Sequence, residues 1–182
     1  MSNIVTKDAA RALPAQQTGL EEQHQYLTFN LGGEMYAIGI LHIKEIIEYG
    51  SVTTVPMMPD FIRGVINLRG AVVPVVDLAL RFARASSPVT RRTCIVIIEV
   101  ESDEERQDVG VMVDAVSEVL EIPAGEIEPA PSFGAKIRAD FIQGMGKVNG
   151  KFVIILNVGK VLSVDEMAML DSLSGGTETQ PV

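Results

Sequence analysis

The sequence is poor in the side chains from which most active sites are built. Its 182 residues include one cysteine, two histidines and no tryptophan. One cysteine excludes an internal disulfide framework and a cysteine-rich zinc site, and two histidines leave little for a metal centre or a catalytic triad. Aromatic residues make up 5% of the chain, so a stacking platform for bases or sugars is not expected. We therefore expect neither a metal nor a cofactor.

Positive charge and long apolar runs are also scarce. Fifteen basic residues stand against 24 acidic ones, for a net charge of −9. Nucleic-acid binding and docking on an anionic membrane both need a concentrated basic surface. No apolar run approaches the roughly 20 residues of a membrane span, and the first residues contain no apolar core of signal-peptide length. We expect a cytoplasmic protein that binds no nucleic acid and does not insert into a membrane. A single unpaired cysteine fits a reducing compartment.

What the chain does contain is a series of short β-rich segments. Hydrophobic residues make up 47% of it, as in a packed globular domain. Apolar stretches of strand length, separated by Gly and Pro, predict strands at 26–31, 35–40, 43–47, 64–68, 71–78, 93–100, 109–113, 117–122, 143–148 and 151–158. This pattern favours an all-β fold of small barrels or a sandwich over a parallel sheet with long helices.

The two ends of the chain have different patterns. Residues 1–23 and 175–182 are polar and lack periodicity, so we expect a disordered lead and a flexible tail around one domain at 24–174. A helix is predicted at 163–174. Ser163 and Glu166 have the spacing of a capping box, and Met167, Leu170 and Leu173 follow at helical intervals.

The sequence repeats itself. Residues 43–48 (IKEIIE) resemble residues 116–121 (VSEVLE), 73 positions later. Residues 61–64 (FIRG) and 72–78 (VVPVVDL) resemble residues 141–144 (FIQG) and 152–158 (FVIILNV), 80 positions later. The change of offset predicts a seven-residue insertion near 132–139. Two β modules that are each too small to bury much apolar surface should share an interface, and we place them at 24–86 and 87–162.

The repeat singles out Arg69. The second copy has Asn149-Gly150 between two predicted strands, a strong type I′ turn pair, whereas the first copy has Arg69-Gly70 there. Arginine is a poorer turn former than asparagine, so formation of the turn does not explain why an arginine stands at this position. Its side chain could bind a partner carboxylate, or it could simply be a solvated surface arginine.

Other candidate residues are few. Glu45 interrupts an apolar strand and recurs in the second copy as Glu118, which suits either an ion pair with a nearby base or a partner contact. Cys94 lies inside a strand and reads as a small apolar side chain. An enzyme would have to use Glu45, Asp77 and Cys94, but no nucleophile, base and orienting group come together in the sequence, and we expect no enzymatic activity.

The residues resemble a known family. Residues 26–32 (YLTFNLG), 40–47 (ILHIKEII) and above all 59–78 (PDFIRGVINLRGAVVPVVDL) are similar to the CheW-like coupling proteins of bacterial chemotaxis. The C-terminal part is similar too, through residues 129–131 (PAP) and 141–146 (FIQGMG). The resemblance covers about residues 25–173.

This resemblance implies two tandem five-stranded SH3-like barrels sharing an interface, with short helices including one at the C-terminus. It implies a non-catalytic adaptor that binds the regulatory domain of the histidine kinase CheA and the cytoplasmic tip of transmembrane chemoreceptors, and that is recruited to membrane-bound receptor arrays. The first barrel would supply the main kinase-facing surface. The positions that match receptor-binding or kinase-control positions of the family are Ile43, Glu45, Gly64, Arg69 and Cys94.

Two other readings remain open at this point. The chain could be a coupling protein of a parallel chemosensory pathway, with motility, development or a second messenger as its output. It could also be the regulatory fragment of a larger kinase or adaptor. The resemblance by itself does not separate these readings.

Overall fold

The computed structural model describes residues 24–82, 84–102, 105–130 and 141–162. Its strands are β1 (Gln25–Leu31), β2 (Glu34–Gly39), β3 (Ile43–Glu48), β4 (Ile62–Leu68), β5 (Ala71–Asp77), β6 (Cys94–Ser102), β7 (Glu105–Val113), β8 (Ala115–Glu121), β9 (Ile127–Glu128), β10 (Ile142–Val148) and β11 (Lys151–Leu156). The short helices are η1 (Ile40–His42), α3 (Leu78–Arg81), η2 (Ala124–Glu126) and α4 (Val158–Val161). The expected lead, insertion, C-terminal helix and tail lie outside the described residues.

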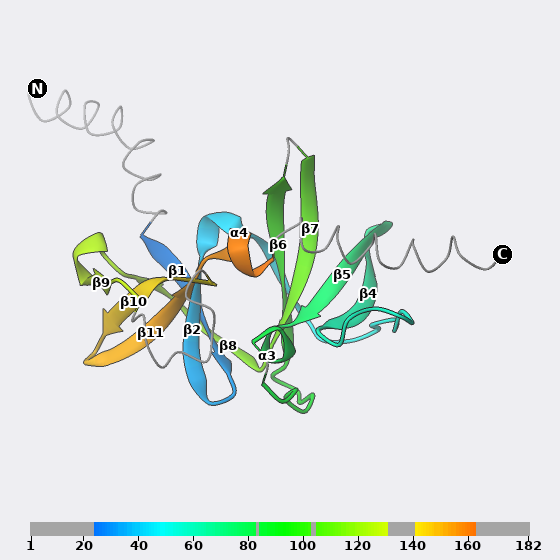
Figure 1. Ribbon diagram of the computed structural model, residues 1–182, viewed down its shortest axis with the longest axis horizontal. Helices are drawn as coiled ribbons and strands as arrows, with labels where there is room; N and C mark the ends of the chain where they lie inside the picture. The colour runs from blue at the N-terminus through cyan, green and yellow to red at the C-terminus, as the bar shows by residue number, and fades with distance from the viewer. Residues whose placement is uncertain (1–23, 83, 103–104, 131–140, 163–182) are drawn as a thin grey trace, which may run out of the picture.

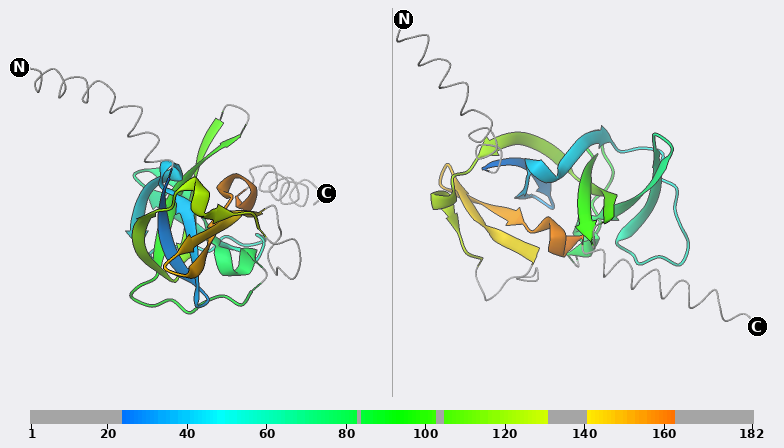
Figure 2. Two further views of the ribbon diagram at one scale, coloured as in Figure 1. Left: turned by 90° about the vertical axis from the view of Figure 1, so that its left-hand side faces the viewer. Right: turned by 90° about the horizontal axis from the view of Figure 1, so that it is seen from above.

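The strands form two sheets that lie side by side (Figures 1 and 2). One has five strands in the order β3-β6-β7-β5-β4, and we call it the first barrel. The other, the second barrel, has the order β8-β1-β2-β11-β10-β9. The all-β expectation is therefore confirmed, with the two-residue strand β9 as a sixth member of the second sheet.

The expected division of the barrels between residues 86 and 87 does not match the sheets. β1 and β2 precede residue 86 but belong to the second barrel, where β2 pairs in parallel with β11. β6 and β7 follow it but belong to the first barrel, where β7 pairs in parallel with β5. Each repeat therefore gives its leading hairpin to the other barrel. Pairing between distant strands, which local patterns do not encode, decides this exchange.

The repeat itself is visible in the structure. The hairpin β4–β5 and the helix α3 correspond to β10–β11 and α4, and the details agree. Asp77 caps α3 by accepting a hydrogen bond from the backbone N–H of Leu80 at 3.3 Å. Asn157 caps α4 in the same way, accepting from the N–H of Lys160 at 3.3 Å. Both caps follow from an Asp or Asn placed directly before a short helix.

The barrels share their largest apolar core, which fits the expected interface. This shared core contains side chains of β1, β2, β6 and β7 and of both α3 and α4. Each barrel also has a smaller core of its own. Arg81 joins the repeats beside the shared core. Its guanidinium lies 5.0 Å from the ring centre of Phe61 and 4.7 Å from that of Phe141, and its Nε donates to the carbonyl of Val161 at 3.0 Å. Since Phe61 and Phe141 are equivalent in the repeat, Arg81 ties the two copies together.

Candidate binding site

Arg69 lies on the turn between β4 and β5 in a backbone conformation that arginine rarely adopts. Its φ is 51°, the same as that of Asn149 on the equivalent turn, and Gly70 and Gly150 follow at 88° and 77°. Asn67 stabilises the first turn by accepting a hydrogen bond from the N–H of Gly70 at 2.8 Å. The turn pair expected from the sequence is therefore present in both copies. A fixed turn holds the base of an exposed cation.

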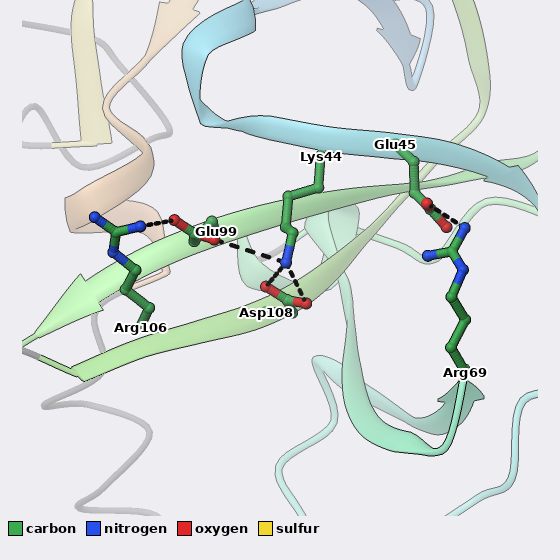
Figure 3. A network of polar contacts seen from close by, with 6 residues as sticks. All are labelled: Lys44, Glu45, Arg69, Glu99, Arg106 and Asp108. Atoms are coloured by element: carbon green, nitrogen blue, oxygen red, sulfur yellow. Dashed lines mark hydrogen bonds and ion pairs between the residues drawn. The ribbon is translucent and has the colours of Figure 1, made fainter.

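The Arg69 guanidinium forms an ion pair with Glu45 on β3 (Figure 3). Its Nη2 donates to Glu45 Oε2 at 2.7 Å. The Arg69 side chain is 75% exposed, whereas that of Glu45 is 26% exposed. Of the two roles considered for Glu45, the structure has the ion pair with a nearby base. An exposed pair of this kind adds little stability, on the order of 0–1 kcal/mol, so its value lies in orienting the arginine.

Gly64 on β4 has a backbone role. Its φ is +150°, and a Cβ at this position would lie 2.1 Å from the carbonyl oxygen of Thr53. The close approach allows Thr53 and Val65 to exchange backbone hydrogen bonds of 2.8 and 2.9 Å. Gly64 is buried, and its missing side chain lets the segment after β3 pair with β4.

Ile43 and Cys94 are half-buried on neighbouring strands of the first barrel. In the antiparallel register of β3 and β6, Ile43 faces Ile98 and Glu48 faces Cys94. Both residues pack against the shared core, and the Cys94 thiol donates to the carbonyl of Arg92 at 3.3 Å. All five candidate residues therefore belong to the first barrel. Glu45 and Arg69 are in direct contact, while Ile43 is the first residue of β3 and Cys94, on β6, lies opposite Glu48, the last residue of β3.

Sequence reasoning missed two exposed apolar residues of the first barrel. Ile46 on β3 is 42% exposed, and Val72 on β5, close after Arg69, is 74% exposed. Their equivalents in the second copy, Val119 and Phe152, are exposed as well. The signal was available, because aligned apolar residues at outward-facing strand positions of both copies indicate contact surfaces rather than core.

A second ion network lies on the same strand, next to Glu45. Lys44 donates to both carboxylate oxygens of Asp108, at 3.2 and 3.1 Å, and lies 3.6 Å from Glu99 (Figure 3). Arg106 continues the network to Glu99 at 3.4 Å and to Glu101 at 3.1 Å. The hydrogen bond and the negative charge of Asp108 raise the pKa of Lys44, so the lysine stays charged well above neutral pH.

The second barrel carries an open groove that the sequence did not predict. It has a volume of about 770 Å³. Its apolar lining comes from Met35, Leu120, Met145, Val148, Phe152, Val153 and Ile154. Glu118 and Asn149 also line it, and these residues are equivalent to Glu45 and Arg69. The first barrel thus has an ion pair at the place where the second barrel has part of a groove.

The residues that an enzyme would have used have structural partners. The buried Asp77 carboxylate caps α3 and accepts a 2.6 Å hydrogen bond from the Ser86 hydroxyl. Glu45 pairs with Arg69, and the Cys94 thiol bonds a backbone carbonyl. Within the described residues, no group of three or more His, Cys, Asp or Glu side chains could hold a metal ion. Nor does this part of the chain contain a helix long and apolar enough to cross a membrane.

Comparison with known proteins agrees with this geometry. The family model of the CheW-like domain matches residues 25–166. The chain is 35% identical over 166 residues to the chemotaxis protein CheW of Klebsiella aerogenes, covering 91% of this chain and 98% of that protein. It is 32% identical to that of Helicobacter pylori over 165 residues, covering 91% and 97% of the two chains.

A solved structure is similar as well. The scaffolding protein TtCheW from Thermoanaerobacter tengcongensis matches with a TM-score of 0.68 and 34% identity, covering 75% of this chain and 85% of that one. The two-barrel architecture fits that of this scaffold, and the match runs through both barrels of the described chain. By family model, by sequence and by fold, the chain belongs to the CheW-like family of chemotaxis coupling proteins.

Proposed function

We propose that this chain is a non-catalytic adaptor of bacterial chemotaxis that couples transmembrane chemoreceptors to the histidine kinase CheA and supports assembly of the signalling array. Membership of a scaffold family supports the role, and the structural partners of Glu45, Asp77 and Cys94 leave them without a catalytic task. The adaptor would work in the cytoplasm and reach the membrane through its partners.

The observation that carries this proposal is the Arg69 turn. Arginine stands where the fold itself favours asparagine, with φ at 51°, and its guanidinium is mostly exposed. Glu45 orients it, and Ile46 on β3 and Val72 on β5 are exposed apolar side chains of the same barrel. A barrel surface that carries an exposed cation as well as exposed apolar side chains suits a partner with both carboxylate and apolar groups. We assign this surface to the cytoplasmic tip of the receptor.

An adaptor needs a second surface, and the groove of the second barrel is the best candidate. Its apolar lining, with Phe152 half exposed, could bury an apolar element of a partner. We assign it to the regulatory domain of the kinase, in addition to the first-barrel contact that the family resemblance implies. Two surfaces on one rigid pair of barrels would hold receptor and kinase in a fixed geometry, so a shift in the receptor changes kinase activity through linked equilibria.

The deciding experiment reverses the charge of Arg69. Arg69→Glu replaces a positive side chain on the turn by a negative one. A partner carboxylate would then be repelled instead of attracted. We expect this variant to reduce kinase activation and co-sedimentation with receptor-containing membranes by at least tenfold, since like charges at an interface cost several kcal/mol. Lys160→Glu, the same charge change at an exposed residue of α4 outside both proposed surfaces, is the matched control.

Stability measurements separate binding from folding. Both variants should unfold at denaturant concentrations close to that of the wild type, because neither side chain is buried. If Arg69→Glu activates the kinase in receptor membranes as well as the wild type does, the role of Arg69 is wrong.

A further inference from the structure

β3 and β8 carry an irregularity at the same place. In the first barrel Ile43 faces Ile98 and Glu45 faces Ile97, so Lys44 is an extra residue in the register, a β-bulge. In the second barrel Val116 faces Phe29 and Val119 faces Leu27, which places a bulge at residues 117 and 118. These positions are 73 residues after Lys44 and Glu45. Bulges commonly re-aim a side chain next to a functional site.

The second barrel fixes its bulge with a neutral hydroxyl. Thr28 Oγ1 donates to the carbonyl of Glu118 at 2.8 Å and accepts from the N–H of the same residue at 3.2 Å. Thr28 is buried, so its hydroxyl is held inside the barrel and has these two backbone groups as partners. The strand registers make Ile97 the equivalent of Thr28 in the first barrel, because each pairs with the corresponding residue of the next strand. Isoleucine has no hydroxyl, so the first barrel needs another way to fix its bulge.

In the first barrel, charged side chains lie at the bulge in place of a hydroxyl. Glu99 and Asp108 face each other across β6 and β7, and two carboxylates so placed repel one another. Lys44, the bulge residue, reaches both of them, at 3.6 Å and 3.1 Å. Their equivalents in the second barrel are uncharged, because Asn30 faces Met35 there and Ser117 replaces the lysine. Through its contacts with Glu99 and Asp108, Lys44 therefore connects the bulge of β3 to the hairpin β6–β7.

We propose that Lys44 is a positioning residue: its contacts with Asp108 and Glu99 fix the bulge of β3 so that Glu45 meets Arg69 and presents it to the partner. The inference rests on the proposed function of Arg69 and adds the element that sets its direction. Figure 3 shows the two contacts on the same stretch of β3, with Lys44 reaching the hairpin and Glu45 reaching the turn. Lys44 acts through Glu45 and need not touch the partner.

The test uses the full-length protein and two measurements. The first is the NMR signal of the Arg69 side-chain Nε–H in the free protein, assigned by its loss in Arg69→Lys. The second is the affinity for receptor membranes with the kinase. Lys44→Ser installs the residue of the second barrel. It should shift the Arg69 signal towards that of Glu45→Gln and weaken binding about threefold to fivefold, the effect of losing one exposed orienting ion pair.

Two rescue variants make the test specific. Lys44→Arg can still bridge both carboxylates and should restore the signal and the affinity. Lys44→Ser with Ile97→Thr transplants the hydroxyl of the second barrel and should restore the Arg69 signal without the charge. Lys160→Ser, at an exposed lysine of α4 outside both proposed surfaces, is the matched control and should change neither measurement.

The outcomes separate the inference from the proposed function. If Lys44→Ser leaves the Arg69 signal unchanged, the positioning role is wrong, whatever happens to binding; weakened binding with an unchanged signal would mean that Lys44 touches the partner directly. If Arg69→Glu leaves binding intact, the proposed function of Arg69 is wrong, and the NMR result still decides whether Lys44 orients it. If both Lys44→Arg and the transplanted hydroxyl fail to restore the signal, the inference is also overturned.

Discussion

The first and second barrels place equivalent strands in the same order, but they differ in the side chains found at the bulge and at the turn. β3-β6-β7-β5-β4 corresponds to β8-β1-β2-β11-β10, with equivalent turns and helix caps. At the bulge and the turn, the first barrel has the charged side chains of Lys44, Glu45 and Arg69, whereas the second has the hydroxyl of Thr28 at the bulge and the neutral Asn149 on the turn. Neutral groups suffice to build this fold. The extra charges lie on the surface to which the proposed function assigns recognition.

The largest effect is expected where the repeats differ in backbone strain. Gly64→Ala would bring a Cβ to 2.1 Å from a backbone oxygen at φ +150°, whereas in Gly144→Ala the closest atom, at 2.6 Å, is a side-chain methyl group of Ile127. A side chain can move and the backbone cannot easily do so. We expect about 3–4 kcal/mol of destabilisation for Gly64→Ala and about 1–2 kcal/mol for Gly144→Ala. Urea unfolding of both variants gives the comparison, and equal losses would contradict it.

Arg81 tests how strongly the two repeats depend on each other. Arg81→Met keeps most of the apolar stem but removes the cation between Phe61 and Phe141 and the hydrogen bond to Val161. We expect a loss of about 2 kcal/mol in the free energy of unfolding. Arg81→Lys should recover part of it, because an ammonium still interacts with the rings but lacks the planar Nε donor. A lysine variant no better than methionine would exclude the ring contacts as the cause.

Tyr36 should make the second barrel sensitive to alkali. Burial, with the nearby Glu34 carboxylate, raises the pKa of Tyr36 from 10.0 to about 12, against a smaller opposing effect of Arg84. The unfolded chain then loses this proton first as the pH rises. The contribution to stability is complete below pH 10 and is lost between about pH 10 and 12.

The equivalent residue of the first barrel, Val109, does not titrate. Tyr36→Phe should therefore flatten the fall in unfolding free energy over this pH range. The measurement is denaturant unfolding at several alkaline pH values, and a fall as steep as in the wild type would exclude Tyr36 as its source.

Exchanging the turn residues should have the smallest effect on stability. Arg69→Asn replaces a residue strained at φ 51° by one that favours the conformation, at the loss of an exposed ion pair, so stability should stay within about 0.5 kcal/mol or rise. Asn149→Arg should cost about 0.5–1 kcal/mol. If Arg69→Asn loses kinase activation at unchanged stability, Arg69 serves recognition. If it unfolds the protein instead, the turn depends on arginine for its structure.

Much of the first barrel was predictable from residues close in sequence. Alternating apolar residues placed most strands to within a few residues, and Asn149-Gly150 correctly identified the turn that Arg69-Gly70 shares. β6 and β7 are longer than predicted because they continue into the charged stretch that begins at Glu101, where ion pairs between Arg106 and the carboxylates of β6 support a ribbon without apolar alternation. The groove of the second barrel was missed, because its lining comes from five separate strands and their turns.

By itself, the sequence determined the family, the all-β class, the repeat and the unusual arginine on a turn, since each depends on residue types at short spacing. Only the tertiary structure decided which hairpin completes which barrel, that Glu45 meets Arg69, and that Lys44 meets Asp108. Strand exchange and exposed ion pairs depend on which distant segments come within a few ångströms. No local pattern in the chain encodes these distances, and exposed ion pairs contribute too little free energy to be specified by residue type alone.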